Sequence, residues 1–283
     1  MDLQIEHISD TARWVAVYRA MESERPDAHF RDPFARRLAG ERGEAIVRSL
    51  RWGRQTAWAM IVRTKVLDDL ILRVIARDCV DLVLNLAAGL DARPYRLDLP
   101  SHVRWVEVDL PGILEYKAVQ LADEHPRCKL DRIATDLTDT VARRALFARL
   151  GAEARRVLVV TEGLLAYLDR EQVASLATDL HATPSFATWL TEIASPRVLK
   201  LMQRRFGKQL GRGGAPMKFG PLEGAEFFRP YGWAPIQAVS MLEEARRLGR
   251  EMPLAWFWRA TTVTARQRAE WRRASLILEL GRT

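Results

Sequence analysis

Acidic residues and one glycine stand at the ends of apolar, β-like segments of this chain. Asp109 follows Gly89 by twenty positions. That interval is typical of a carboxylate that accepts hydrogen bonds from ribose hydroxyls in nucleotide-binding folds. Carboxylates gathered in one place also attract cationic ligands. The candidate residues at the four segment ends are Gly89, Asp109, Asp136 with its neighbour Leu137, and Glu162.

The arrangement of apolar residues explains why these side chains should meet. Short apolar or β-branched runs alternate with helix-length segments, which is typical of βαβ units and of a parallel sheet covered on both faces. Ligands bind beyond the carboxyl ends of the strands in such sheets, so residues that end different strands line one edge. The expected strands are 80–87, 103–109, 129–136, 155–162, 185–193 and 272–280.

The rest of the chain reads as helices and one long loop. From residue 10 to about residue 77, apolar residues recur at three and four positions, which predicts amphipathic helices. Helices are also expected over 197–211 and 237–249, and the loop 211–224, rich in Gly and Pro, is the candidate mobile cover. We expect one domain over 1–283, divided into an N-terminal helical cover (1–78), a core (79–195), and a lid with C-terminal strands (196–283).

Composition excludes several other classes of protein. The formal charge is +8, but the arginine pairs lie within apolar, periodic segments, so we expect solvated helix faces and no nucleic-acid partner. No apolar stretch has the length of a signal or a membrane span, which predicts a cytoplasmic protein without membrane contact. Cys79 and Cys128 read as ordinary thiols, and the histidines lack metal-ligand spacing, so no metal is expected.

The residues of the turn after the first expected strand help to distinguish between two kinds of nucleoside ligand. A pyrophosphate needs several glycines whose amides approach it closely, whereas this turn has one glycine followed by Asp91 and Pro94. S-adenosylmethionine (SAM) carries a sulfonium and an ammonium in place of phosphates, and the acidic segment ends have the sign that attracts them. Asp136 alone would fit a helix-capping role. Because four segment ends carry such residues at the same edge of the expected sheet, a SAM site is favoured.

Several motifs resemble the leucine carboxyl methyltransferase family, including its bacterial branch of SAM-dependent O-methyltransferases in polyketide pathways. They are NLAAGLDARPYRL, VEVDLPGILEYK, ATDL and TEGLLAYL, with RDPFA and IVRTKVLDD upstream. The resemblance implies an α/β, Rossmann-like class I methyltransferase fold. Its sheet would have seven mostly parallel strands with helices on both faces and an N-terminal helical cover.

The resemblance also implies roles for individual residues. Arg63 would hold the SAM carboxylate, Gly89 would underlie the methionine portion, Asp109 would bind the ribose, Asp136 with Leu137 would bind the adenine, and Glu162 would lie at the amino acid moiety. The family commonly has Gly-Ala-Gly where this chain has Ala87-Ala88-Gly89. We therefore expect either a negative φ at Ala87 or a slight displacement of the loop.

The chemistry of methyl transfer leaves the acceptor open. The leaving thioether needs no proton, so a carboxylate acceptor would need no base, whereas a phenol would profit from one. No base stands out in a segment-end motif, which favours a carboxylate. Tyr167, His29 and His181 are the candidate catalytic groups. The aromatic residues Trp256, Phe257 and Trp258 could contact an aromatic acceptor or pack internally.

These inferences lead to one function with two alternatives. The leading expectation is a SAM-dependent O-methyltransferase that acts on a carboxylate or hydroxyl of a small acidic or aromatic molecule, of polyketide type. One alternative is a protein methyltransferase that acts on a C-terminal carboxylate. The other is a SAM-binding or nucleic-acid-associated module without transferase activity.

Overall fold

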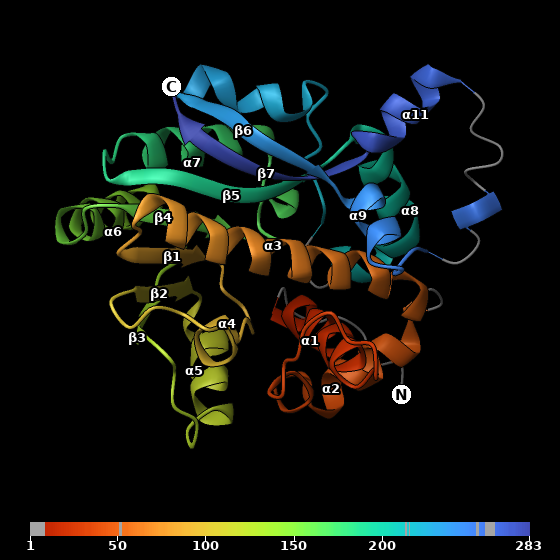
Figure 1. Ribbon diagram of the computed structural model, residues 1–283, viewed down its shortest axis with the longest axis horizontal. Helices are drawn as coiled ribbons and strands as arrows, with labels where there is room; N and C mark the ends of the chain where they lie inside the picture. The colour runs from red at the N-terminus through yellow and green to blue at the C-terminus, as the bar shows by residue number, and fades with distance from the viewer. Residues whose placement is uncertain (1–8, 51–52, 213, 215, 253–254, 258–263) are drawn as a thin grey trace.

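A twisted sheet runs through the centre of the molecule (Figure 1). The computed structural model describes residues 9–50, 53–212, 214, 216–252, 255–257 and 264–283. Its seven strands are ordered β3-β2-β1-β4-β5-β7-β6, with β7 antiparallel to both neighbours and the other pairs parallel. The strands are β1 (Leu82–Leu86), β2 (Arg104–Asp109), β3 (Lys129–Ala134), β4 (Val157–Thr161), β5 (Phe186–Ala194), β6 (Trp233–Ser240) and β7 (Ser275–Arg282). The expected α/β fold class is confirmed.

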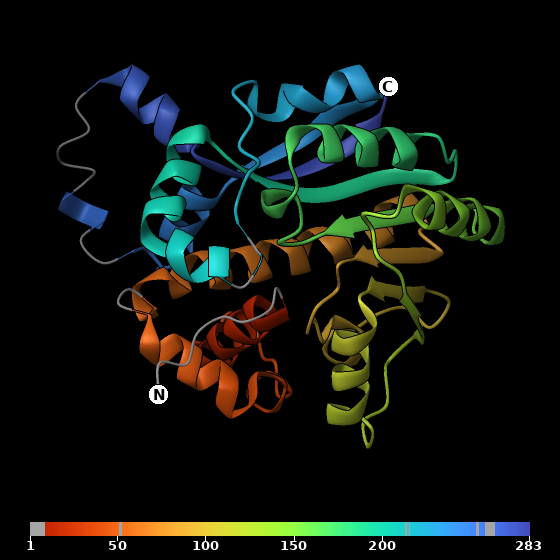
Figure 2. The same cartoon turned by 180° about the vertical axis from the view of Figure 1, so that it is seen from behind.

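Helices cover both faces of the sheet because its central strands are apolar on both sides. One face packs against α3 (Ala57–Asp78), which crosses in front of the strands in Figure 1, and against α9 (Met241–Arg247). The opposite face packs against α6 (Thr140–Glu153), α7 (Arg170–His181) and η3 (Gly224–Tyr231), which face the viewer in Figure 2. All five residues of β1 and of β4 are buried, as expected for strands covered twice.

A helical cover packs beyond the carboxyl ends of the first strands. It consists of α1 (Ser9–Ser23), α2 (Ala35–Ser49), η1 (Arg54–Thr56), the start of α3, and α8 (Pro196–Arg212). Trp14 of α1 packs on Phe206 of α8, with 5.2 Å between ring centroids. Arg19 donates to the Leu90 carbonyl oxygen at 2.6 Å and to Asp32 at 2.8 Å. The cover is therefore tied directly to the turn that follows β1.

In the described part of the chain, four further short helices connect elements of the sheet or its covers. They are α4 (Arg93–Arg96), α5 (Pro111–Gln120), η2 (Leu165–Tyr167) and α11 (Ala265–Arg272). In the loop after α8, the amides of Lys218 and Phe219 both donate to the Ala166 carbonyl oxygen, at 2.7 and 3.3 Å, and Phe219 is buried. These contacts hold that part of the expected mobile cover against η2.

One expected element is wrong. Residues 237–240, read as the start of a helix, complete the edge strand β6, and the helix begins only at Met241. Ser240 ends the strand and caps the helix, because its side chain accepts a hydrogen bond from the Glu243 amide. Pro235 and a register shift between Pro235 and Gln237 interrupt the strand pattern. Such an interrupted edge strand gives a weak signal in sequence.

Other general expectations can be compared with the described residues. Cys79 and Cys128 are free thiols, as expected. Within the described ranges, no helix is both long enough and apolar enough to cross a lipid bilayer. In the same part of the chain, no three His, Cys, Asp or Glu side chains gather in an arrangement that could hold a metal ion.

Candidate functional site

The turn after β1 joins two of the residues singled out in the sequence. Gly89 has a φ of +49°, and a Cβ at this position would lie 3.2 Å from the Ala12 Cβ of α1. The Gly89 amide donates to Asp109 Oδ2 at 2.6 Å, and the Leu110 amide donates to Oδ1 at 2.7 Å. Burial raises the pKa of the Asp109 carboxyl, against these two hydrogen bonds. The carboxylate is thus fixed beside the glycine turn, directly under α1.

Arg63 and Glu162 also meet, although they stand 99 positions apart in sequence. Arg63 is buried in α3, and its Nε donates to Glu162 Oε1 at 2.9 Å. Its Nη1 lies 3.4 Å from Glu192 Oε1, at the end of β5. The amide of Gly163 donates to that same oxygen at 2.5 Å. One guanidinium is therefore shared between the carboxylates that end two neighbouring strands.

Arg93 of α4 extends this contact into a buried chain of alternating charges. Its Nη1 donates to Glu162 Oε2 at 2.7 Å and to Asp91 Oδ2 at 2.9 Å, and its Nε donates to Asp68 at 2.6 Å. Arg96 binds the same Asp68. We call this set the charge chain; its members are the arginines 63, 93 and 96 and the carboxylates of Asp68, Asp91, Glu162 and Glu192. With every member ionised, three cations face four anions.

Burial and neighbouring charges divide the carboxylates of the charge chain into two kinds. Burial alone would raise the pKa of Asp91 and of Glu162, but Arg93 and the other cations outweigh it, so both carboxyls titrate below their ordinary range. Glu192 differs. Burial raises its pKa to about 7, because Arg63 only partly offsets the loss of water. The site therefore contains a carboxyl that can exchange a proton near neutral pH.

Glu192 was missed in the sequence, although the rule that found the other acids applies to it. It lies one residue before the end of the expected strand 185–193, where Ile193 continues the apolar run and hides the strand end. Its Oε2 is buried and has no hydrogen-bond partner in the part of the chain that the structure describes. Its side chain is 16% exposed. The fifth strand thus adds a carboxylate to those at the carboxyl ends of the other parallel strands.

Asp136 and Leu137 follow β3 but do not join the charge chain. Asp136 is exposed, and its Oδ1 accepts hydrogen bonds from the Thr138 amide at 2.8 Å and from the Thr138 hydroxyl at 2.7 Å. This is a local turn and not a helix cap, because the residue that caps α6 is Asp139. Leu137 packs against the core on the α6 side. An adenine site at these two residues stays a prediction.

The three candidate catalytic groups lie in different places. Tyr167 is at the end of η2, next to Arg63, and burial raises the pKa of its phenol against a hydrogen bond with Thr11 of α1. His29 Nε2 lies 2.6 Å from the Leu248 carbonyl oxygen. His181 packs edge-on against Trp233, at the amino edge of the sheet where β6 begins. Of these three groups, only Tyr167 lies close enough to the charge chain to interact electrostatically with Arg63 and Glu192.

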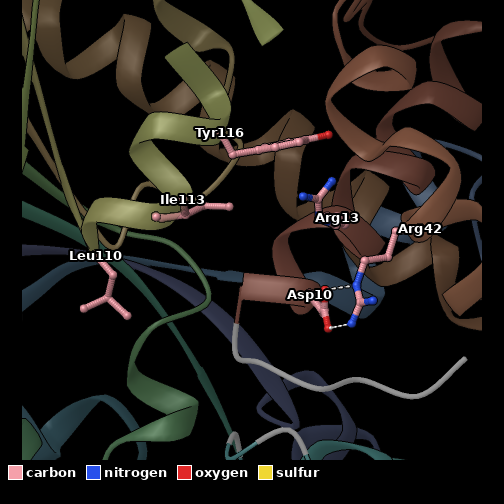
Figure 3. A pocket seen from close by; sticks show the side chains of 7 residues that line it. Asp10, Arg13, Arg42, Leu110, Ile113 and Tyr116 are labelled. Atoms are coloured by element: carbon pink, nitrogen blue, oxygen red, sulfur yellow. Dashed lines mark hydrogen bonds and ion pairs between the residues drawn. The ribbon is translucent and has the colours of Figure 1, made fainter. Parts of the chain in front are cut away.

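A pocket opens beside the ribose candidate Asp109 (Figure 3). Its volume is about 220 Å³, and the next residue, Leu110, is part of its wall. Arg42 pairs with Asp10 at 2.6 Å, whereas the Arg13 guanidinium carbon lies 3.7 Å from the centroid of the Tyr116 ring. Among the described residues, Arg13 has no carboxylate partner. The pocket is lined by Asp10, Arg13, Arg42, Leu110, Gly112, Ile113 and Tyr116.

The aromatic residues near the C-terminus lie at the surface. Trp256 and Phe257 are 63% and 49% exposed and contact each other edge to face. Trp258 lies outside the described residues. The two described rings therefore do not pack in the core, and their contact with an acceptor stays a prediction.

Ala87 adopts a conformation that corrects one expectation. Its φ is +54°, so the alternative of a negative φ is wrong. The turn after β1 needs this left-handed residue because the chain must bring Gly89 back over the end of β2, where the Ala88 amide donates to the Val108 carbonyl oxygen at 3.2 Å. A left-handed alanine costs about 1–2 kcal/mol relative to its preferred region. The chain therefore carries strain where the family commonly has glycine.

Comparison with known proteins places this chain among SAM-dependent methyltransferases. The family model described as leucine carboxyl methyltransferase matches residues 12–181. A protein from Parafrankia sp. is 33% identical over 268 residues, which cover 89% of this chain and 86% of that protein. One from Frankia alni is 33% identical over 277 residues, which cover 92% and 85%. Both relatives are assigned by name to the S-adenosyl-L-methionine-dependent methyltransferases.

Two solved structures share the fold at low sequence identity. A DUF574 family protein from Streptomyces avermitilis superposes with a TM-score of 0.61 at 16% identity, covering 96% of this chain and 97% of its own. A protein from Thermobifida fusca, titled as a methyltransferase, superposes with a TM-score of 0.57 at 16% identity, covering 98% and 95%. These likenesses concern the fold alone.

The strain at Ala87 generates a first prediction. Ala87→Gly should leave the free energy of unfolding unchanged or raise it by up to about 1 kcal/mol, because relief of the left-handed alanine outweighs the extra flexibility of glycine in the unfolded chain. Ala88→Gly is the matched control, since Ala88 is buried and has no positive φ. It should lower stability. Urea denaturation that found equal losses in both variants would contradict the strain.

The raised pKa of Glu192 generates a second prediction. Its folded pKa, about 7, exceeds the ordinary value of 4.5, so its favourable contribution to stability is present below pH 4.5 and is lost as pH rises through 7. The free energy of unfolding of Glu192→Gln, taken relative to that of the wild type, should therefore be about 2 kcal/mol higher at pH 8.5 than at pH 5.5. Denaturant titrations at both pH values measure this change.

A surface carboxylate provides the control for that titration. Glu153 pairs with Arg104, whose hydrogen bond lowers the pKa of the Glu153 carboxyl. Its contribution changes only at pH values below its ordinary range, so Glu153→Gln should differ from the wild type by the same amount at pH 5.5 and 8.5. A Glu192→Gln variant that behaved like Glu153→Gln would refute the neutral-range titration.

Proposed function

The chain belongs to the leucine carboxyl methyltransferase family, and on this premise we propose that it transfers a methyl group from SAM to an oxygen atom of a small acidic molecule. Its membership and its named relatives make it a SAM-dependent methyltransferase. The proposal adds the oxygen acceptor, a carboxylate or hydroxyl, and an acceptor of small, polyketide-like type. The observation that carries it is a pair of anchors at one edge of the sheet: Asp109 beside Gly89, and Arg63 beside Glu162.

The residues at this edge fit SAM. The left-handed Gly89 faces Ala12 so closely that a larger residue would close the turn. Asp109 holds its two oxygens beside that turn and can accept hydrogen bonds from ribose hydroxyls. Arg63 can bind the carboxylate of the amino acid portion, and the excess of acids in the charge chain suits the sulfonium and ammonium. SAM supplies a methyl group activated by its bond to a positively charged sulfur.

The chain's own residues would position the reaction and exclude water from it. Asp109 and Arg63 hold the two ends of an extended ligand, which fixes the direction from which an acceptor must approach. Two residues of α1 cover the space between these anchors. Ala12 lies over Gly89, and Thr11 forms a hydrogen bond with Tyr167. Methyl transfer would therefore take place beneath the helical cover.

The depth of the site supports a small acceptor rather than a protein. Arg63, Tyr167 and Glu192 are all buried, and a polypeptide tail would need a groove that reaches them. Arg13 adds a reason to expect an acidic acceptor. Its guanidinium borders the pocket beside Leu110 and has no carboxylate partner among the described residues. An anionic group entering on that side would find a positive charge.

Removal of either anchor should affect different parts of the ligand. Asp109→Asn should weaken SAM, S-adenosylhomocysteine (SAH) and adenosine together, because all three carry the ribose. Arg63→Gln should weaken SAM and SAH by at least about tenfold, as expected for the loss of a charged hydrogen bond, and leave adenosine unchanged. Isothermal calorimetry measures the three affinities.

A surface arginine serves as the control for these titrations. Arg37 pairs with Glu124 on the exposed side of the cover, so Arg37→Gln should bind all three ligands like the wild type. Equal weakening of SAM and adenosine by Arg63→Gln would show that Arg63 does not hold the carboxylate of the amino acid portion.

The size of the acceptor can be tested before the acceptor is identified. A lysate of the source cells, incubated with the protein and SAM labelled in its methyl group, should yield label in the ultrafiltrate of small molecules. Asp109→Asn should reduce that label strongly, which controls for other methyltransferases in the lysate. Label in protein, released by alkali, would favour a protein carboxyl methyltransferase. Absence of any protein-dependent label would favour a SAM-binding module without transferase activity.

A further inference from the structure

Glu192 has one oxygen that no group of the described residues satisfies. Its Oε1 is held by the Gly163 amide and lies near Arg63. Its Oε2 is buried and has no partner among the described residues. Buried carboxylate oxygens are nearly always hydrogen-bonded, because burial of an unpaired polar atom costs free energy. The geometry therefore leaves a place for a hydrogen-bond donor that the described part of the chain does not supply.

Resting on the proposed function, we propose that Glu192 accepts the proton of a hydroxyl acceptor during methyl transfer, and that its negative charge beforehand favours SAM over SAH. The class of acceptor is then a phenol or alcohol rather than a carboxylate. The site is the carboxyl edge of β5, next to Glu162 and beneath Tyr167. In contrast with the sequence, which offered no base at a segment end, the structure supplies one.

The step balances in atoms and charge. The bond between sulfur and the methyl carbon breaks with its electrons on sulfur, the acceptor oxygen forms the new bond to carbon, and Glu192 Oε2 takes the hydroxyl proton. One positive charge leaves the sulfonium while one negative charge is neutralised at Glu192. The summed charge of the site is therefore unchanged, which avoids a net change of charge in a buried place. Glu192 later returns its proton to water.

The groups that face Glu192 restrict this role to it. Arg63 from α3 and Arg93 from α4 are its cationic neighbours, and both already contact Glu162. Glu162, with its pKa lowered by these two arginines against burial, stays ionised. Tyr167, with its pKa raised by burial, stays a neutral phenol. Glu192, whose pKa burial raises to about 7, is the member of this group that exchanges a proton near neutral pH.

Calorimetry with SAM and SAH tests the charge of Glu192 without an acceptor. The two ligands differ by one methyl group and one positive charge, so only SAM gains from ionised Glu192. The preference of the wild type for SAM over SAH should rise several-fold between pH 5.5 and 8.0, with about tenfold as the limit for a coupling of one pKa unit. In Glu192→Gln this rise should be absent.

Glu279→Gln provides a matched control. Glu279 is a buried carboxylate on the neighbouring strand β7, it also has an oxygen without a partner among the described residues, and it pairs with Arg77 away from the charge chain. In Glu279→Gln the preference for SAM over SAH should rise with pH as much as it does in the wild type. An equal rise in the wild type and Glu192→Gln, or no rise in the wild type, would overturn the proposal.

Two further readouts keep the proposal testable if Glu192→Gln fails to fold. With the wild type at pH 7, titrations in buffers of different ionisation enthalpy should find that SAM binding releases more protons than SAH binding; equal release would refute the charge coupling. The labelled product from the lysate should be a methyl ether, stable to mild alkali, and an alkali-labile ester would refute the proton transfer. Failure of both ligands to bind would contradict the proposed function itself.

Discussion

The charge chain is the constraint on which the site depends. Buried ions are stable only when each meets an opposite charge in good geometry, and removal of one partner leaves the other uncompensated. Arg93 satisfies this demand by contacting carboxylates from α3, from the turn after β1 and from the end of β4. Three elements that are distant in sequence are thereby held at one edge of the sheet.

The same demand ties the helical cover to the sheet. Asp68 of α3 binds both Arg93 and Arg96, and Asp32 of the cover binds Arg19, which also reaches the Leu90 carbonyl oxygen. A cover that moved as a rigid body would break the contact of Arg19 with the Leu90 carbonyl oxygen and would separate Asp32 from Arg96, whose Nε lies 3.9 Å from Asp32 Oδ2.

Strand periodicity and strand-end chemistry predicted much of this structure, and the failures have physical causes. The five parallel strands were found because burial on both faces demands continuous apolar runs, and Asp109 and Glu162 were found because they end such runs. Arg63 was identified only through the family motif, since helical periodicity says nothing about a distant carboxylate. Asp91 was noted for its charge, but its partner Arg93 was not. The φ of Ala87 depends on where β2 lies, which no local pattern encodes.

The different behaviour of Glu162 and Glu192 follows from how two guanidinium groups are divided between them. Glu162 receives one hydrogen bond from Arg63 at 2.9 Å and one from Arg93 at 2.7 Å. Among the described residues, Glu192 receives only the longer contact from Arg63, at 3.4 Å, together with one amide. Because burial is similar for both, the number of close cations decides which carboxylate keeps its charge. An arrangement with one fixed and one exchangeable carboxylate separates the two tasks of a methyltransferase site: holding a cationic donor, and receiving a proton from its acceptor.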